Sequence, residues 1–246
     1  MKIAVTVKII YDPEVEPKVN KGTLDYKKTK RIIDPIDEAS IAAAVNFKKI
    51  VPSVEVLVIC ASRESDKGFL RYALAMGANE VIFIKIASSD NILVDGLITA
   101  KVLRRTIVAE QFDLILVGRA SSDNGSGFVG PALSTLLGWR QLYYVCGLLG
   151  EDAGQLKIRC KILNRTLIFL IKLPCVLVCE FEKSDKFVSL LDFMRSKNKN
   201  IRIKTLNKLN LIANSSVSVV NYAVPKRVRL VKSIDNVNNL MKTLFS

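Results

Sequence analysis

Runs of β-branched apolar residues alternate with amphipathic stretches through the first 140 residues, and this alternation constrains the fold more than any other feature. The apolar runs are Ile3–Lys8, Val54–Cys60, Glu80–Ile86 and Asp113–Gly118. Nearly continuous runs of this kind are typical of strands buried on both faces of a sheet. Helical patterns lie over Glu38–Lys49, Ser65–Met76, Asn91–Ala109 and Ser126–Leu137. The alternation predicts an α/β protein with a doubly wound, mostly parallel sheet.

The pattern changes after Arg140, where four short apolar runs are separated only by turns. They are Leu142–Leu148, Leu156–Leu163, Thr166–Lys172 and Cys175–Phe181. Short connections join antiparallel strands, and Asn164-Arg165 suits the turn of a hairpin. We therefore predict antiparallel strands at the edge of the parallel sheet.

The last part of the chain is basic and poor in core residues. Residues 183–246 carry 13 Lys and Arg against 3 Asp and Glu, out of a net charge of +14. Nucleic acid is one partner that such charge suits. However, this segment has few aromatic residues and no nucleic-acid-binding signature, so we favour a solvated surface or docking to an acidic protein. We predict an α/β domain over residues 1–182 and an arm over 183–246. The arm ends in a helical pattern with Val237, Leu240, Met241 and Leu244 as its apolar face.

Composition excludes several classes of site. The chain has no histidine, which removes Ser-His and Cys-His nucleophiles and the commonest metal ligand. Its five cysteines form no CxxC pair, so we expect small buried side chains in a reducing compartment and no metal site. No apolar run reaches the roughly 18 residues of a membrane span. The N-terminus has no signal-peptide pattern, and we expect a soluble intracellular protein.

The most distinctive short segment is RASSDNGSGFVGPALSTLL (119–137), which follows a buried strand and becomes an apolar helix. Ligands of open α/β sheets bind beyond the carboxyl ends of the strands. Free N–H groups at a helix start attract anions, and glycines let the backbone approach them closely. The loop could therefore cradle a phosphate, but it matches neither GxGxxG nor GxxxxGK[ST]. An ordinary glycine-rich loop explains it equally well.

Other strand ends could meet this loop. They are Thr6-Val7-Lys8 at the end of the first strand, Cys60-Ala61-Ser62 at the end of the second, and Asp34-Pro35-Ile36-Asp37 before the first helix. Asp34 and Asp37 could act as a carboxylate pair. They are also typical of helix capping, with Asp34 as the N-cap, Pro35 at the first helical position and Asp37 in the first turn. The two roles are compatible.

Several blocks of the sequence, in this order, resemble the β subunit of electron transfer flavoproteins over nearly the whole chain. They are KIAVTVK (2–8), IDPIDEASIAAAVNFK (33–48), LRYALAMGANEVIFI (70–84), FDLILVGRASSDNGSGFVGPALSTLLGW (112–139), IKLPCVLVCEF (171–181), KFVSLLDFMRSKNKNI (186–201) and VPKRVRLV (224–231). The fold that the resemblance implies is of the adenine nucleotide α-hydrolase-like type.

The resemblance implies an electron carrier and not an enzyme. Such a β subunit forms a heterodimer with an α subunit, which holds most of one FAD. The flavin accepts electrons from acyl-CoA or other flavin dehydrogenases and passes them to a quinone oxidoreductase. The β subunit itself holds a structural AMP, or a second FAD in bifurcating or anaerobic-pathway relatives. The resemblance implies a cytoplasmic protein in bacteria and a mitochondrial matrix protein in eukaryotes, without nucleic-acid binding or membrane insertion.

The same resemblance implies a set of binding residues. The nucleotide contacts would be Thr6, Asp34, Pro35, Ile36, Asp37, Cys60, Gly118, Arg119, Ala120, Ser121, Ser122, Asp123, Asn124, Gly125, Ser126, Gly127, Phe128 and Val129. The segment 186–201 matches the family's recognition loop, with Leu190 as the apolar anchor and Arg195, Lys197 and Lys199 as basic residues beside it. An apolar anchor with a basic rim suits a transient complex.

The sequence departs from the family at a few of these positions. Many members have Asn, Gln and Thr where this chain has Gly127, Phe128 and Val129, so AMP, FAD or an empty site remain alternatives. Lys161 stands where many members have an acidic residue that pairs with the α subunit. A nucleotide-hydrolysing enzyme, with Lys8 or Arg119 at the phosphates and Asp123 at Mg²⁺, is a further hypothesis, and a nucleotide-binding sensor module is another.

Overall fold

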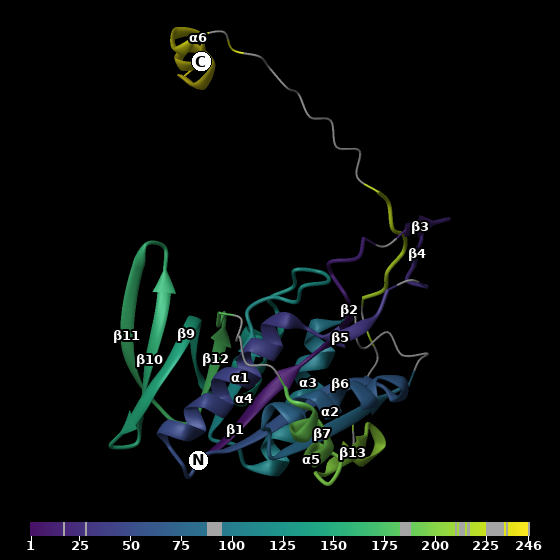
Figure 1. The fold of residues 1–246 in the computed structure, drawn as a ribbon, viewed down its shortest axis with the longest axis vertical. Coiled ribbons are helices and arrows are strands. Elements are labelled where there is room, and N and C mark those ends of the chain that lie inside the picture. Colours follow the sequence, from purple (N-terminus) through teal and green to yellow (C-terminus); the bar gives the residue numbers. More distant parts are fainter. Residues whose placement is uncertain are drawn as a thin grey trace.

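The computed structural model describes residues 1–246 except 17, 28, 88–94, 183–187, 210, 212–214, 216, 225–233, 235 and 246. Its centre is one large sheet (Figure 1). Across the sheet the order is β11 (Arg165–Lys172), β10 (Gln155–Ile162), β9 (Arg140–Asp152), β12 (Cys175–Cys179), β8 (Leu114–Gly118), β1 (Lys2–Val7), β6 (Glu55–Arg63), β7 (Glu80–Ile86) and β13 (Ile201–Thr205). Neighbouring strands from β9 through β12 to β13 are parallel, and β9, β10 and β11 pair antiparallel. The predicted α/β class, with a mostly parallel sheet and antiparallel edge strands, is confirmed.

Helices cover both faces of the sheet. On one face α1 (Pro35–Ile50) and α2 (Leu70–Met76) bury residues such as Ile41, Phe47 and Leu74 against β1 and β6. On the other face α3 (Gly96–Glu110) and α4 (Val129–Leu137) bury Val102, Leu133 and their neighbours. The side chains of a strand alternate between the two faces, so each parallel strand contributes to both cores. This is the doubly wound arrangement that the strand–helix alternation predicts.

Two predicted helices begin later than their patterns suggest. The pattern over Ser65–Met76 contains a 3₁₀-helix, η1 (Glu64–Phe69), which leads into α2. The helix predicted over Ser126–Leu137 begins at Val129, because Ser126 and Gly127 belong to the loop. The start of the pattern over Asn91–Ala109 lies partly outside the described residues, and α3 begins at Gly96. The structure also contains two small two-stranded sheets that we did not predict. They are β2 (Ile9–Tyr11) with β5 (Arg31–Ile33) and β3 (Lys18–Asn20) with β4 (Thr23–Asp25).

One strand lies in a different place from the one we predicted. We expected Cys175–Phe181 among the antiparallel edge strands, but β12 lies between β8 and β9 and is parallel to both. All five of its residues are buried, which agrees with the continuous apolar run typical of a central parallel strand. The predicted hairpin is present between β10 and β11, but its loop is residues 163–164, one residue earlier than expected.

The segment after residue 182 includes regular structure of its own. β13 extends the sheet beside β7, and Arg202 on β13 donates hydrogen bonds of 2.8 and 2.9 Å to the two carboxylate oxygens of Glu80. The helix α5 (Leu190–Ser196) packs against α2. The predicted C-terminal helix is present as α6 (Val237–Phe245), whereas most of VPKRVRLV lies outside the described residues. Among the residues that are described, no helix has the length and apolarity to cross a membrane.

Candidate functional site

The order of the strands reverses between β1 and β8. From β1 the chain continues through β6 and β7 on one side, and then returns through α3 to β8 on the other side of β1. Ligands of open α/β sheets bind in the crevice that such a reversal creates at the carboxyl ends of the strands. A pocket of about 120 Å³ lies here, which is room for several water molecules or a single ring-sized group.

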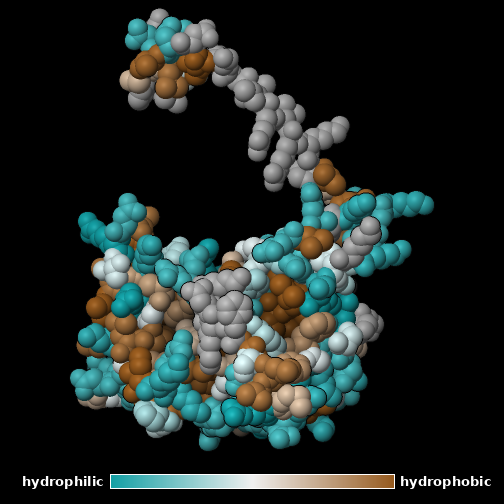
Figure 2. Space-filling view, viewed as in Figure 1, coloured by the Kyte–Doolittle hydropathy of each residue, from teal (hydrophilic) through white to brown (hydrophobic). Residues whose placement is uncertain are grey.

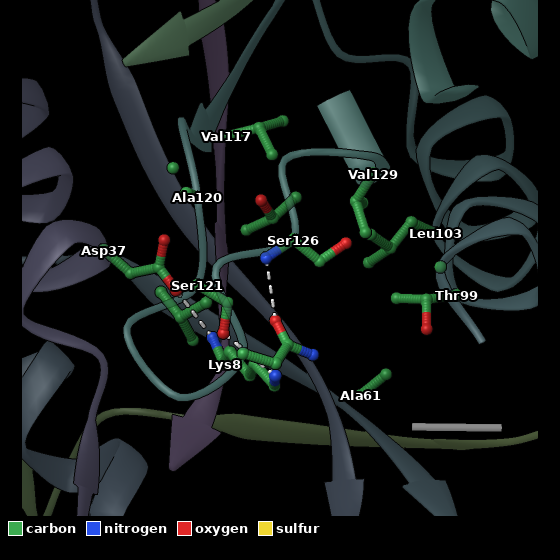
Figure 3. A pocket seen from close by; sticks show the side chains of 15 residues that line it. Lys8, Asp37, Ala61, Thr99, Leu103, Val117, Ala120, Ser121, Ser126 and Val129 are labelled. Carbon is green, nitrogen blue, oxygen red and sulfur yellow. Dashed lines mark hydrogen bonds between the residues drawn. The ribbon is translucent and has the colours of Figure 1, made fainter. Parts of the chain in front are cut away.

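The pocket has a polar side and an apolar side (Figure 3). Lys8, Ser121 and Asp37 stand together on one side, where β1 and β8 end and α1 begins. Leu103 and Val129 stand on the other side, from α3 and α4. The site therefore suits a ligand with an anionic group at one end and a flat apolar group at the other.

Asp34 connects the start of α1 to the loop after β8. Its Oδ1 accepts a hydrogen bond from the N–H of Ile36 at 3.1 Å, which is the predicted N-cap, with Pro35 next to it at the start of the helix. The same carboxylate accepts from the N–H of Ser122 at 2.8 Å and from its hydroxyl at 2.7 Å. Asp34 is buried, so one carboxylate caps a helix and fixes the loop together.

Asp37 lies in the first turn of α1, as predicted, and contacts the chain where β1 and β8 end. Its Oδ2 accepts from the N–H of Lys8 at 2.8 Å, and a Cβ on Gly118 would lie 2.5 Å from its Oδ1. Burial raises the pKa of the Asp37 carboxyl well above its usual range, and the nearby Asp34 raises it further. A side chain at position 118 would therefore have to displace the Asp37 carboxyl group.

Lys8 supplies the positive charge of the pocket. Its Nζ donates to Ser121 Oγ at 2.9 Å and to Asp123 Oδ1 at 2.6 Å, and the Ser121 hydroxyl also donates to Asp123. Partial burial alone would raise the pKa of Asp123, but the hydrogen bonds from Lys8 and Ser121 outweigh it and hold that pKa below its usual value. Asp123 is therefore ionised at neutral pH and holds the Lys8 ammonium at the pocket.

The loop from 118 to 128 keeps its shape through its own hydrogen bonds. The N–H of Gly125 donates to the carbonyl of Ser121 at 2.8 Å, and the N–H of Ser126 donates to Asn124 Oδ1 at 2.9 Å. The loop runs into α4, and within the described residues no side chain caps that helix. Because the first N–H groups of a helix lack partners inside it, the start of α4 offers donors to an anion beside Ser126.

The structure brings part of the predicted nucleotide set together at the pocket. The predicted residues that line it are Thr6, Asp37, Gly118, Ala120, Ser121, Asn124, Ser126 and Val129. The remaining predicted residues lie in the same segments but are not among its lining: Asp34, Pro35, Ile36, Cys60, Arg119, Ser122, Asp123, Gly125, Gly127 and Phe128. Some of these hold the loop in place. Arg119, for example, donates to Glu180 at 3.0 Å, and the Gly127 carbonyl accepts from the Tyr143 hydroxyl at 3.1 Å.

Sequence reasoning did not assign four residues of the pocket wall, Gly96, Thr99, Leu103 and Val117. Val7, Lys8 and Ala61 also line it; they were considered at the strand ends, and Lys8 as a phosphate contact of a hydrolysing enzyme, but they were not in the predicted nucleotide set. Cys60 is buried in the core on the α1 and α2 face, and it is Ala61, one residue later, that reaches the pocket. Burial raises the pKa of the Cys60 thiol, as is typical of an inert core cysteine. Within the described residues, no group of three His, Cys, Asp or Glu side chains is arranged to hold a metal ion.

Comparison with known proteins gives the family of this fold and site. The electron transfer flavoprotein domain matches residues 22–207. The electron transfer flavoprotein subunit beta of Bradyrhizobium diazoefficiens is 26% identical over 99% of this chain and 97% of that protein. The subunits beta of Dictyostelium discoideum and Homo sapiens are 22% and 23% identical over 99% of this chain and 97% and 96% of theirs. The chain belongs to the electron transfer flavoprotein family, and it is similar to the β subunits of that family over nearly its whole length.

Proposed function

We propose that this chain is the β half of a heterodimeric electron carrier and holds AMP in the pocket between β1 and β8. An α-type partner would bind most of an FAD, and the two chains together would position the flavin. The observation that carries the proposal is a pocket at the reversal point of the sheet with a lysine and two serines on one side and apolar residues on the other. In this role the chain catalyses no bond chemistry of its own.

The polar side of the pocket suits the phosphate of AMP. Lys8 would give a charge-assisted hydrogen bond, and Ser121 and Ser126 would give neutral ones. The N–H groups at the start of α4 add donors and the positive end of a helix dipole. The conformation of the loop supports this arrangement, because Gly127 lies where a Cβ would be 2.7 Å from the carbonyl of Arg119. The remaining predicted loop and cap residues act by holding this backbone.

The apolar side suits the nucleoside. Ala61, Leu103 and Val129 come from three different elements, β6, α3 and α4. A planar base buries apolar area against such walls, and each Å² removed from water contributes about 25 cal/mol. The space of about 120 Å³ has room for a single ring-sized group, so either nucleotide, AMP or FAD, would extend beyond it.

The surface of α5 would serve the exchange of electrons with other proteins. Leu190 and Leu191 are exposed there, and Arg195 and Lys197 are exposed beside them. We assign this surface to flavin dehydrogenases, including acyl-CoA dehydrogenases, and we place a quinone oxidoreductase downstream. Residues 1–182 would hold the nucleotide, and residues 183–246 would contact partners. One plant relative is named as mitochondrial, so we place the chain in the matrix in a eukaryote and in the cytoplasm in a bacterium.

Nucleotide analysis of the purified complex tests the proposal. The chain would be co-expressed with the α-type subunit of the same genome, and the complex would be denatured and its released nucleotides separated and identified by mass. One FAD and one AMP per heterodimer are expected. Two FAD would support the alternative of a bifurcating or anaerobic-pathway carrier. A lone chain that hydrolyses ATP, or one that never associates with a flavin-bearing subunit, would overturn the proposal.

A further inference from the structure

Two basic side chains join α2 and α5 in a reciprocal way. Arg71, in the first turn of α2, donates from Nη1 to the carbonyl of Ser196 at 2.8 Å and to the carbonyl of Lys199 at 2.7 Å. Both acceptors lie at or just after the C-terminal end of α5. The last carbonyls of a helix lack partners inside it and carry partial negative charge. Arg71 therefore acts as a C-terminal cap for α5 from another helix.

Lys199 does the same for α2. Its Nζ donates to the carbonyl of Leu74 at 3.0 Å and to the carbonyl of Ala78 at 2.8 Å, at the C-terminal end of α2. Burial lowers the pKa of this ammonium, the nearby Lys48 lowers it further, and Asp192 opposes both. We predicted Lys199 in the basic rim of a partner-binding loop. Its ammonium is instead directed into the fold, whereas Arg195 and Lys197 remain exposed.

The helix that these contacts anchor has an apolar outer surface. Leu190 is 78% exposed and Leu191 68% exposed, and Phe193 and Met194 are also exposed. Figure 2 shows apolar side chains gathered in the region of α5. α5 has only seven residues, and a helix this short is unstable in isolation. Its orientation therefore depends on its cap, Ser189, which accepts from the N–H of Asp192 at 3.1 Å, and on its contacts with α2.

We infer that Arg71 and Lys199 are positioning residues for the outer surface of α5. The inference rests on the proposed function, in which that surface binds a flavin dehydrogenase. By tying the C-terminal end of α5 to both ends of α2, the two side chains present Leu190 and its neighbours in one arrangement before the partner binds. Pre-ordering of this kind removes an entropy cost of association. Loss of either anchor should therefore weaken docking and leave the electron transfer step within the docked complex unchanged.

The rest of the fold does not depend on these anchors. α2 buries Leu70, Ala73 and Leu74 in the core, and β13 is held by its pairing with β7 and by Arg202. Removal of an anchor should then loosen α5 locally and leave the sheet intact. A positioning role therefore predicts faster hydrogen exchange in α5 alone, whereas a general role in stability predicts faster exchange in the sheet as well.

The experiment uses the co-expressed heterodimer with four variants, Arg71→Lys, Arg71→Met, Lys199→Gln and Lys199→Arg. Arg63→Lys, at the exposed end of β6, is the matched control. The first readout is amide hydrogen exchange of residues 190–199 against that of β13. The second is the rate of electron uptake from a purified medium-chain acyl-CoA dehydrogenase with octanoyl-CoA, measured against carrier concentration. Arg71→Lys keeps the charge but loses the planar fork that reaches several carbonyls.

We expect Arg71→Lys, Arg71→Met and Lys199→Gln to accelerate exchange in 190–199 about tenfold or more, because each loses hydrogen bonds to a charged donor. Exchange in β13 and in the Arg63→Lys control should not change. The same three variants should raise KM for the carrier with kcat within about twofold of the wild type, since only the ordering cost of docking changes. Lys199→Arg keeps a cation at the carbonyls and should restore both readouts.

Two results would overturn the inference. Unchanged exchange in 190–199 for all variants would show that the anchors do not fix α5. A raised KM for Lys199→Gln with unchanged exchange would show that Lys199 contacts the dehydrogenase directly. A different result concerns the proposed function. If the wild-type complex accepts no electrons from the dehydrogenase while exchange responds as expected, the docking assignment is wrong and the anchoring of α5 stands.

Discussion

The carboxylate of Asp34 accepts two hydrogen bonds from Ser122, at 2.8 Å from its backbone N–H and at 2.7 Å from its hydroxyl. The two residues are 88 positions apart in the chain. The same carboxylate caps α1. One buried side chain therefore couples the first helix after β1 to the loop after β8, and these two segments supply Asp37 and Ser121 to the polar side of the pocket.

We predict that Asp34→Ala destabilises the complex by about 2 kcal/mol, because it removes a buried carboxylate that caps α1 and accepts two hydrogen bonds from Ser122. Urea unfolding of the heterodimer at fixed protein concentration measures the loss. The control is Asp152→Ala, at the exposed end of β9, which should change the free energy of unfolding by less than about 0.5 kcal/mol. Equal effects of the two substitutions would contradict the coupling role of Asp34.

Gly118 gives a steric prediction with a matched control in the same chain. A Cβ at this position would lie 2.5 Å from Asp37 Oδ1 and 3.1 Å from the Ile36 side chain. Both neighbours are fixed at the start of α1, so Gly118→Ala should cost about 1–3 kcal/mol of stability and distort the pocket.

Gly68→Ala is the control, because no atom beyond the adjoining chain lies within 4 Å of the Cβ it would add. Gly68 lies in the 3₁₀-helix η1, where alanine is expected to be neutral or slightly stabilising. Thermal unfolding of both variants, together with the nucleotide content of the purified complexes, checks the pair. A Gly118→Ala variant with wild-type stability and nucleotide content would show that α1 can move away from β8.

Much of the fold follows from local pattern. Asp34-Pro35 predicts a helix start because an acceptor before a proline satisfies the free N–H groups of the first turn, and α1 begins there. The central strands are continuous apolar runs, which require cover on both faces. β12 shows the limit of this reasoning. Its sequence CVLVC has the same pattern, but its short connections to β11 suggested an antiparallel edge strand, and the pairing partners of a strand are set by the tertiary fold.

The site was predicted less completely, for two physical reasons. Cys60 and Ala61 are adjacent on β6, and successive side chains of a strand point to opposite faces of the sheet. Choosing the wrong one of two neighbouring residues therefore replaces a pocket residue with a core residue. Ala61 reaches the pocket and Cys60 does not. The wall from α3, with Gly96 and Thr99, had a weaker signal. The helix α3 follows β7, and in a parallel sheet the helix after each strand starts at the carboxyl edge of the sheet. The start of α3 therefore lies at the same edge as the ends of β1 and β8.

The buried Asp37 gives a prediction about pH. Burial raises the pKa of this carboxyl well above its usual range, whereas in the unfolded chain an aspartate has a pKa of about 3.9. Between these two values the folded state binds more protons than the unfolded state, so the free energy of unfolding falls as pH rises. The stabilising contribution is full below about pH 4 and is lost as pH rises through the folded pKa.

Asp37→Asn should remove this part of the pH dependence. The pKa values of Asp123 and Glu110 are lowered in the fold, so those groups act in the opposite direction, but they are present in both proteins. The difference between the urea midpoints of wild type and Asp37→Asn, measured across pH, therefore isolates Asp37. The wild type should lose stability relative to the variant as pH rises. Parallel profiles would contradict the raised pKa.

Lys8 gives the sharpest test of how the pocket binds a nucleotide. It is a cation held at the pocket by Ser121 and Asp123, and a hydrogen bond to a charged group contributes about 1.5–3 kcal/mol. Because each 1.4 kcal/mol is a factor of ten in affinity, Lys8→Met should weaken AMP binding roughly tenfold or more. Adenosine has no phosphate, so its affinity should change much less.

Calorimetric titration of the heterodimer, stripped of nucleotide, with AMP and with adenosine measures both affinities. Lys67→Met is the control, because Lys67 lies on η1 and pairs only loosely with Glu64 at 3.7 Å. It should bind both ligands as the wild type does. If Lys8→Met weakened the binding of AMP and of adenosine equally, the lysine would be acting on the shape of the pocket through Asp123. The phosphate would then have to bind at the loop and at the start of α4 without Lys8.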